Sequence, residues 1–273
     1  MMTKKILITS GDHKISAVID YPKRLSKKLA VLCPGFLDSK DYSHLAELAK
    51  ALTENGYTVL RFDPTGTWGS GGDISQYTTT QYLMDVESTI QYMLKKRPFQ
   101  HILIGGHSRG GQIALLYAAR DPHISIVLAI MPSSNVGKEK GAKGIADWES
   151  SGFRVSYRDL PANRTEKRVF KVPVLHLKDL RDYNVIRDVK RINIPVILVA
   201  GESDVLCPPE AIGKIFDNAN NPKRLITIPK IGHDYRHKDR EIKIVNAHIM
   251  KILKETEFAL TKQKHNHANR TKR

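Results

Sequence analysis

The sequence predicts an α/β protein built on a mostly parallel, doubly wound sheet. Short apolar runs, such as 28–33 and 57–62, alternate with stretches whose apolar residues recur at helical spacing, such as 79–95. The alternation is regular up to residue 132, breaks off, and resumes after residue 191. Strands that alternate with helices pair in parallel and carry helices on both faces of the sheet.

Each expected element follows from its local pattern. Residues 5–9 and 14–21 alternate around a polar turn and predict an antiparallel hairpin. The other apolar runs predict strands at 28–33, 57–62, 101–104, 124–131, 195–200 and 224–228. The helical periodicities predict helices at 42–53, 79–95, 113–118, 209–216 and 238–256.

The break in the alternation divides the chain. Between 133 and 191, aromatic residues are interleaved with charge, and Pro161 and Pro173 interrupt any long helix. We therefore expect a core of residues 1–132 and 192–256, with 133–191 as a small insertion over the top of the sheet. The basic end, 257–273, is expected to be disordered, since its last thirteen residues hold five Lys or Arg and no acid.

Composition excludes several classes of protein. The net charge of +16 is concentrated in the basic end and the insertion, without a nucleic-acid-binding motif, so no specific nucleic-acid partner is expected. Apolar runs are too short for a signal peptide or a membrane span. Cys33 and Cys207 are the two cysteines, which favours free thiols and a cytoplasmic protein. His265 and His267 lack the neighbours of a metal site.

The segment Gly106-His107-Ser108-Arg109-Gly110 has the G-x-S-x-G form of a nucleophile elbow. It lies between an apolar strand and an apolar helix, where a sharp turn would lift the serine hydroxyl clear of the sheet. A glycine-rich turn with an incidental serine has the same pattern. The interpretation therefore depends on finding a base and an acid.

Asp204 and His233 supply that acid and base in the order Ser, Asp, His, each directly after an expected strand. A histidine held by a carboxylate can take the proton of the serine. Glu202 is a rival for the acid and His237 a weaker rival for the base. Asp204 could instead cap a turn, and His233 could be an ordinary surface histidine.

The oxyanion of such a reaction needs two backbone N–H donors. Arg109, directly after the serine, should supply one. Phe36 in the segment Cys33-Pro34-Gly35-Phe36 should supply the other, with Gly35 keeping the backbone open to substrate. The alternative is an ordinary Pro-Gly turn.

With these segments, together with Phe62-Asp63-Pro64-Thr65-Gly66 and its Ser70, residues 5–256 resemble the serine hydrolases of the α/β-hydrolase fold. The resemblance is greatest to the acyl-esterase, monoglyceride-lipase and feruloyl (cinnamoyl) esterase group. It departs from that group at Pro34, where relatives commonly have His, and at Trp68, where they have a second glycine. Trp68 either lines a substrate pocket or packs under the insertion.

The resemblance implies a catalytic triad of Ser108, Asp204 and His233, a cap formed by 133–191, and pocket contacts from Trp68, Gly35 and His107. It implies hydrolysis of a small-molecule carboxylic ester through an acyl-enzyme, without a metal or organic cofactor. Thioesterase, amidase or peptidase, and acyltransferase activities remain open, because all can use this triad. A non-catalytic ligand-binding protein of the same fold is the alternative of another class. The oligomeric state stays open.

Overall fold

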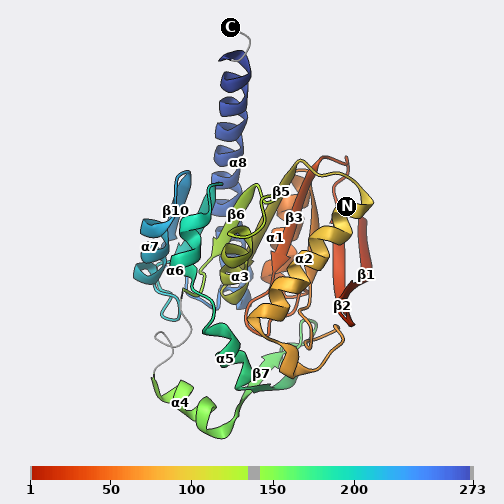
Figure 1. The fold of residues 1–273 in the computed structure, drawn as a ribbon, viewed down its shortest axis with the longest axis vertical. Helices are drawn as coiled ribbons and strands as arrows, with labels where there is room; N and C mark the ends of the chain where they lie inside the picture. Colours follow the sequence, from red (N-terminus) through yellow and green to blue (C-terminus); the bar gives the residue numbers. More distant parts are fainter. Residues whose placement is uncertain (1, 135–141, 271–273) are drawn as a thin grey trace.

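A computed structural model describes residues 2–134 and 142–270 (Figure 1). Its main sheet has eight strands in the order β1-β2-β4-β3-β5-β6-β9-β10. β2 is antiparallel to both β1 and β4, and the remaining strands are parallel. The strands are β1 Met2–Ser10, β2 His13–Tyr21, β3 Lys28–Cys33, β4 Tyr57–Phe62, β5 His101–His107, β6 Ile126–Ile130, β9 Val196–Gly201 and β10 Lys223–Ile228. The expected fold class, mostly parallel α/β, is confirmed.

Helices cover both faces of this sheet (Figure 1). A row of contacting helices lies on one face: α2 Thr79–Lys96, α3 Arg109–Ala118, α6 Val185–Asp188 and α7 Pro209–Asn218. On the other face α1 Ser43–Glu54 packs against α8 Asp239–Arg270. Covered on both sides, the central strands are mostly apolar, and every residue of β4 and β9 is buried. The buried Arg61 of β4 is an exception and pairs with Asp20 (3.1 Å).

The insertion forms a small layer at one end of the sheet. It contains α4 Ala142–Ser151, the antiparallel pair β7 Phe153–Asp159 and β8 Lys167–Pro173, and α5 Leu175–Leu180. The Tyr42 hydroxyl donates to the Asp159 carbonyl oxygen (2.7 Å), and Arg236 forms an ion pair with the Asp159 carboxylate (3.0 Å). In Figure 1 this layer lies at the lower end of the molecule, opposite the projecting end of α8.

The far boundary of the insertion comes earlier than residue 191. Val185–Asp188 and the following 3₁₀ turn Val189–Arg191 pack against the core helices α3 and α7, and both Val185 and Val189 are buried. A crossover between the parallel strands β6 and β9 needs such a segment on the sheet face. We therefore propose that the cap ends near residue 184. Residues 135–141, which the expected insertion included, lie outside the described residues.

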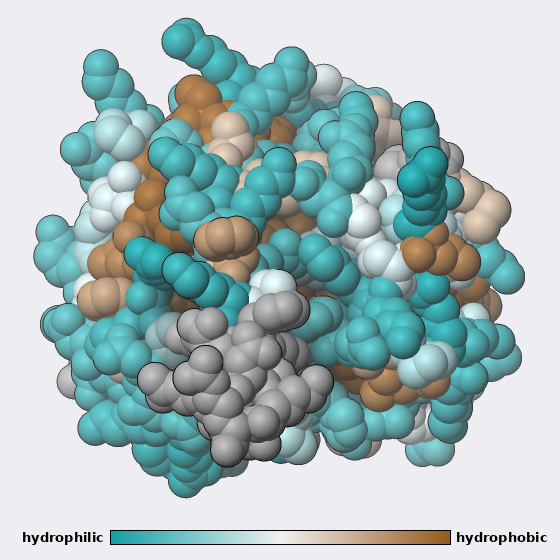
Figure 2. Space-filling model, turned by 90° about the horizontal axis from the view of Figure 1, so that it is seen from above, coloured by the Kyte–Doolittle hydropathy of each residue, from teal (hydrophilic) through white to brown (hydrophobic). Residues whose placement is uncertain are grey.

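α8 continues to Arg270, past the expected end of the helix at Thr256, so the expectation of disorder from 257 is wrong as far as residue 270. No Gly or Pro occurs between 256 and 270 to end the helix. Glu257 also ties this part to the core, accepting from Lys28 Nζ (2.9 Å) and from the Tyr57 hydroxyl. Hydrophilic side chains cover most of this end of the molecule, with smaller apolar areas between them (Figure 2). Residues 271–273 lie outside the described residues.

Two expectations from composition can be compared with the structure. Within the described residues, no helix is both long and apolar enough to cross a membrane. Cys33 and Cys207 are both buried free thiols, as expected.

Candidate active site

Ser108 occupies a strained turn between β5 and α3. Its backbone angles are φ 55° and ψ −118°, in a region that non-glycine residues rarely adopt. The Ser108 N–H donates to the carbonyl oxygen of Ile130 (2.9 Å), which fixes the turn against β6. The side chain is therefore held at the carboxyl end of the sheet by backbone geometry.

Crowding explains the glycines around this serine. A Cβ on Gly110 would lie 1.9 Å from the Cys33 carbonyl oxygen, and one on Gly106 would lie 2.4 Å from the same atom. Real Cβ atoms do not approach an oxygen so closely. The two glycines let the elbow and the end of β3 pass in contact, which an alanine at either position would prevent.

Ser108, His233 and Asp204 form a continuous hydrogen-bonded chain. His233 Nε2 lies 2.9 Å from Ser108 Oγ, and His233 Nδ1 lies 2.7 Å from Asp204 Oδ2. The second carboxylate oxygen, Asp204 Oδ1, accepts from the backbone N–H groups of Leu206 (2.9 Å) and Cys207 (2.8 Å). These two bonds fix the orientation of the Asp204 carboxylate independently of its hydrogen bond to His233. The structure therefore brings together the three residues that were predicted from the sequence to form a triad.

The rival residues lie elsewhere. The Glu202 carboxylate accepts a hydrogen bond from the Lys230 N–H (2.9 Å), in the loop that follows β10. His237 is exposed, and its carbonyl oxygen accepts from Arg164 of the insertion (2.8 Å). Neither has a recorded contact with Ser108 or His233.

The environment of His233 makes it a stronger base than a free imidazole. Burial by itself lowers the pKa of His233, but the hydrogen bond to Asp204 and the neighbouring Cys207 thiol raise it by more. The net result is a pKa above the ordinary value of about 6.5. Such a histidine can take a proton from Ser108 and hold it.

The turn that carries Phe36 is held rigidly beside the serine. The Asp38 N–H donates to the Gly35 carbonyl oxygen (3.1 Å), and Leu37 adopts a φ of 56°. Two buried tyrosines support it, with the Tyr77 hydroxyl accepting from the Leu37 N–H (3.0 Å) and the Tyr82 hydroxyl donating to the Pro34 carbonyl oxygen (2.8 Å). Arg109 begins α3, where N–H groups have no partner within the helix.

A cavity of about 830 Å³ opens above Ser108 between the core and the cap. Its apolar lining includes Phe36 from the core and Ile145, Trp148, Leu177 and Leu180 from the cap. Aromatic rings of the insertion pack against the turn that carries Phe36. His176 is stacked between Trp148 (5.5 Å between ring centroids) and Tyr77 (5.3 Å). Residues of the insertion therefore form part of the wall of the cavity beside Ser108.

The three predicted pocket residues do not all lie at the cavity. His107 lines the cavity, whereas Trp68 and Gly35 are not among its lining residues. The Trp68 indole N–H donates to the Leu37 carbonyl oxygen (3.0 Å), and its ring packs edge-on against Phe170 of the cap (5.5 Å). Trp68 is thus the packing residue under the insertion, the second of the two interpretations. A Cβ on Gly35 would lie 2.5 Å from the Asp38 carboxylate, so this glycine leaves room for Asp38.

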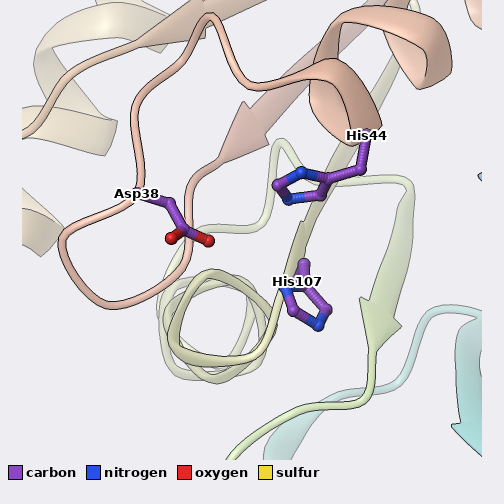
Figure 3. A group of neighbouring side chains, drawn as sticks. All are labelled: Asp38, His44 and His107. Atoms are coloured by element: carbon purple, nitrogen blue, oxygen red, sulfur yellow. The ribbon is translucent and has the colours of Figure 1, made fainter. Parts of the chain in front are cut away.

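Asp38, His44 and His107 form a buried polar cluster that the sequence did not reveal (Figure 3). They come from the loop after β3, the start of α1 and the end of β5, and no local motif links them. The four imidazole nitrogens have no hydrogen-bond partner among the described residues. Burial above all, then nearby positive charge, lowers the pKa of His44 to about 3 and that of His107 well below its ordinary value. Both rings are therefore neutral beside His233, whose ring centroid lies 4.7 Å from that of His107.

Two groups of side chains in the described part of the chain have donor atoms close enough for one metal ion. Asp38, His44 and His107 form one, and Asp204, Cys207 and His233 form the other. In the second group, His233 already bonds to Asp204 through Nδ1 and to Ser108 through Nε2. These hydrogen bonds account for the second group without a metal ion, and we assign none to it.

Comparison with known proteins places this geometry in a wider context. A family model described as serine aminopeptidase, S33, matches residues 25–173. A polyketide transferase from a Penicillium species is 25% identical over 243 residues, covering 74% of this chain and 80% of the relative.

The fold recurs in solved structures. The protein Est1E of Butyrivibrio proteoclasticus, solved with ferulic acid bound, superposes with a TM-score of 0.74 at 24% identity, covering 92% of this chain and 98% of Est1E. The α/β hydrolase GrgF from Penicillium gives a TM-score of 0.78 at 20% identity, covering 94% and 99%. At these identities the structural likeness shows the fold alone.

Proposed function

Because the chain belongs to the serine aminopeptidase S33 family of α/β hydrolases, we propose that it cleaves a carboxylic ester through an acyl-enzyme. The observation that carries the proposal is the Ser108–His233–Asp204 hydrogen-bonded chain at the floor of the cavity. A serine hydroxyl attacks carbonyls poorly until a base removes its proton, and this chain places the base 2.9 Å away.

The reaction proceeds in two halves. Ser108 Oγ bonds to the ester carbonyl carbon while its proton passes to His233 Nε2, and Asp204 stabilises the resulting imidazolium. Collapse of the tetrahedral intermediate breaks the bond to the alcohol oxygen, which takes the proton from His233. Water then gives a proton to the same nitrogen as its oxygen bonds to the acyl carbon. The second tetrahedral intermediate collapses by breaking the bond to Ser108 Oγ, which takes the proton back from His233 as the acid leaves. The N–H groups of Arg109 and Phe36 donate to the oxyanion in both halves.

Charges around the cavity favour esters over peptides with a free amino terminus. Such a peptide brings a positive charge, and aminopeptidase chemistry needs carboxylates placed to receive it. Here, within the described part of the chain, four arginines (Arg109, Arg154, Arg158 and Arg236) line the cavity, against three aspartates (Asp38, Asp147 and Asp234). The asymmetry supports an ester substrate, although amide and thioester carbonyls are chemically open to the same serine.

The expected pH dependence follows from the raised pKa of His233. Only the neutral imidazole accepts the serine proton, so kcat/KM for para-nitrophenyl butyrate should rise with pH, with its inflection above about 6.5. Asp204→Asn removes the carboxylate that raises this pKa, so the inflection should move to lower pH while kcat falls by about 10⁴-fold. Alanine para-nitroanilide, measured in parallel, should be cleaved more slowly than the ester.

Two outcomes would contradict the assignment. One is a rate that stays constant between about pH 5 and pH 9, because no group of raised pKa would then control the reaction. The other is an inflection that the Asp204→Asn variant leaves in place, because His233 would then not be the group that titrates.

A further inference from the structure

Three arginines line the cavity without an acidic partner. Arg109, Arg154 and Arg158 all contribute to its wall, and among residues 2–134 and 142–270 none of the three forms an ion pair. Arg236, which also lines the cavity, differs: two of its nitrogens bond the Asp159 carboxylate at 3.0 and 3.2 Å. Arg109 is buried and Arg158 is half-buried, whereas Arg154 is exposed. A cation removed from water is stable when it is paired, so Arg109 and Arg158 need an explanation.

Arg109 is the most deeply placed of them. Its side chain is 3% exposed and lies between Tyr77 and Tyr82, whose ring centroids are 5.2 and 5.9 Å from the guanidinium carbon. Its polar contact is one long hydrogen bond to the Thr79 hydroxyl (3.3 Å), and its Nε has no partner within the described chain. The faces of the two tyrosines offset part of the cost of removing this charge from water.

Arg154 and Arg158 bring two more positive charges from the cap. They are four positions apart on β7, so both side chains lie on the same face of the hairpin. Arg158 Nη2 donates to the Phe36 carbonyl oxygen (2.8 Å), while its buried Nε has no partner among the described residues. Burial and, after it, the charge of Arg158 lower the pKa of Arg154, as expected for two cations that no anion separates.

The carboxylates of the cavity do not neutralise this group. Asp147 and Asp234 are exposed, and Asp38 is buried beside Gly35 and His107. Burial raises the pKa of Asp38, and the charges of Arg236 and Arg158 oppose that rise. Arg154 and Arg158 therefore give the wall of the cavity formed by β7 a cationic surface.

We propose that the substrate is an ester that carries an anionic group, a carboxylate or a phosphate monoester, on the part that reaches β7, where Arg154 and Arg158 bind it. Guanidinium groups bind both anions through paired N–H donors, and they do so most strongly where water is excluded. Arg109 adds a third positive charge, from the core, to the lining of the same cavity. This inference rests on the proposed function and narrows its substrate class.

The test uses two matched pairs of esters, because the anion could belong to either side of the ester bond. On the acyl side, mono-para-nitrophenyl adipate is compared with para-nitrophenyl hexanoate, which has the same chain length and no charge. On the alcohol side, butyrylglycerol phosphate is compared with monobutyrin. In at least one pair the anionic ester should have a kcat/KM about tenfold higher or more, a preference that declines as salt is added.

Variants identify the residues responsible. Arg154→Gln should lower the ratio of anionic to neutral kcat/KM by about tenfold, and Arg158→Gln should act in the same direction. Arg168→Gln is the matched control. Arg168 lies opposite Arg158 on the neighbouring strand β8 but does not line the cavity, so the ratio should stay unchanged. Using the ratio removes any general loss of activity in a variant.

The outcomes separate this inference from the proposed function. Neutral esters cleaved as well as the anionic ones in both pairs would overturn the inference and leave the ester hydrolase intact. A preference for the anion that survives both Arg154→Gln and Arg158→Gln would overturn the assignment to β7. Failure to cleave any of the four esters would overturn the proposed function and the inference together.

Discussion

Ser108→Ala and His233→Ala are each expected to lower kcat for ester hydrolysis by about four to six orders of magnitude. The alanine at 108 removes the attacking oxygen, and the alanine at 233 removes the group that takes its proton from 2.9 Å. Because the two act as one unit, the double variant should be little worse than either single variant. Initial rates with para-nitrophenyl butyrate measure all three.

His237→Ala is the control for this prediction. His237 is exposed and has no recorded contact with Ser108, so its removal should leave kcat within about twofold. Thermal unfolding should show that every variant is folded. If His237→Ala were as damaging as expected for His233→Ala, and His233→Ala were mild, the base would be misassigned.

Gly110→Ala is expected to destabilise the fold severely. Its new Cβ would lie 1.9 Å from the Cys33 carbonyl oxygen and 2.6 Å from the Cys33 carbonyl carbon, both backbone atoms of a central strand. Backbone cannot move aside as a side-chain tip can, so β3 and α3 would have to separate. We expect a loss of about 3–5 kcal/mol in the free energy of unfolding, measured by urea denaturation.

Gly213→Ala provides the matched control. Gly213 lies inside α7, and a Cβ there would meet nothing within 4 Å. Alanine is the better helix former by about 1 kcal/mol, so this variant should be slightly more stable than the natural protein. A Gly110→Ala protein that unfolds at the same urea concentration as the natural one would refute the packing argument.

Much of the core could be predicted because its strands are buried on both faces. The runs 28–33 and 57–62 match β3 and β4 in full, since every residue of the two strands except Lys28 is buried. The serine, the acid and the base each come after such a strand, and the carboxyl ends of parallel strands meet at one edge of the sheet. Their association is therefore a consequence of topology alone.

The rest depends on tertiary contacts that have no local pattern. In β7 and β8, charged residues such as Arg154 and Lys171 interrupt the apolar pattern by which a strand is predicted. The hairpin is stabilised instead by its packing over the core. Asp38 and His44 meet His107 only because α1 begins beside the end of β5. Trp68 was open to two interpretations until its contacts with Leu37 and Phe170 were known.

Labelling with a fluorophosphonate tests the central claim most directly. The reagent bonds to a serine whose proton a neighbouring base removes, and the intact mass of the protein records each adduct. We expect one adduct on the natural protein and none on Ser108→Ala. No adduct on the natural protein after prolonged exposure, or equal labelling of the Ser108→Ala variant, would contradict an activated serine at this elbow.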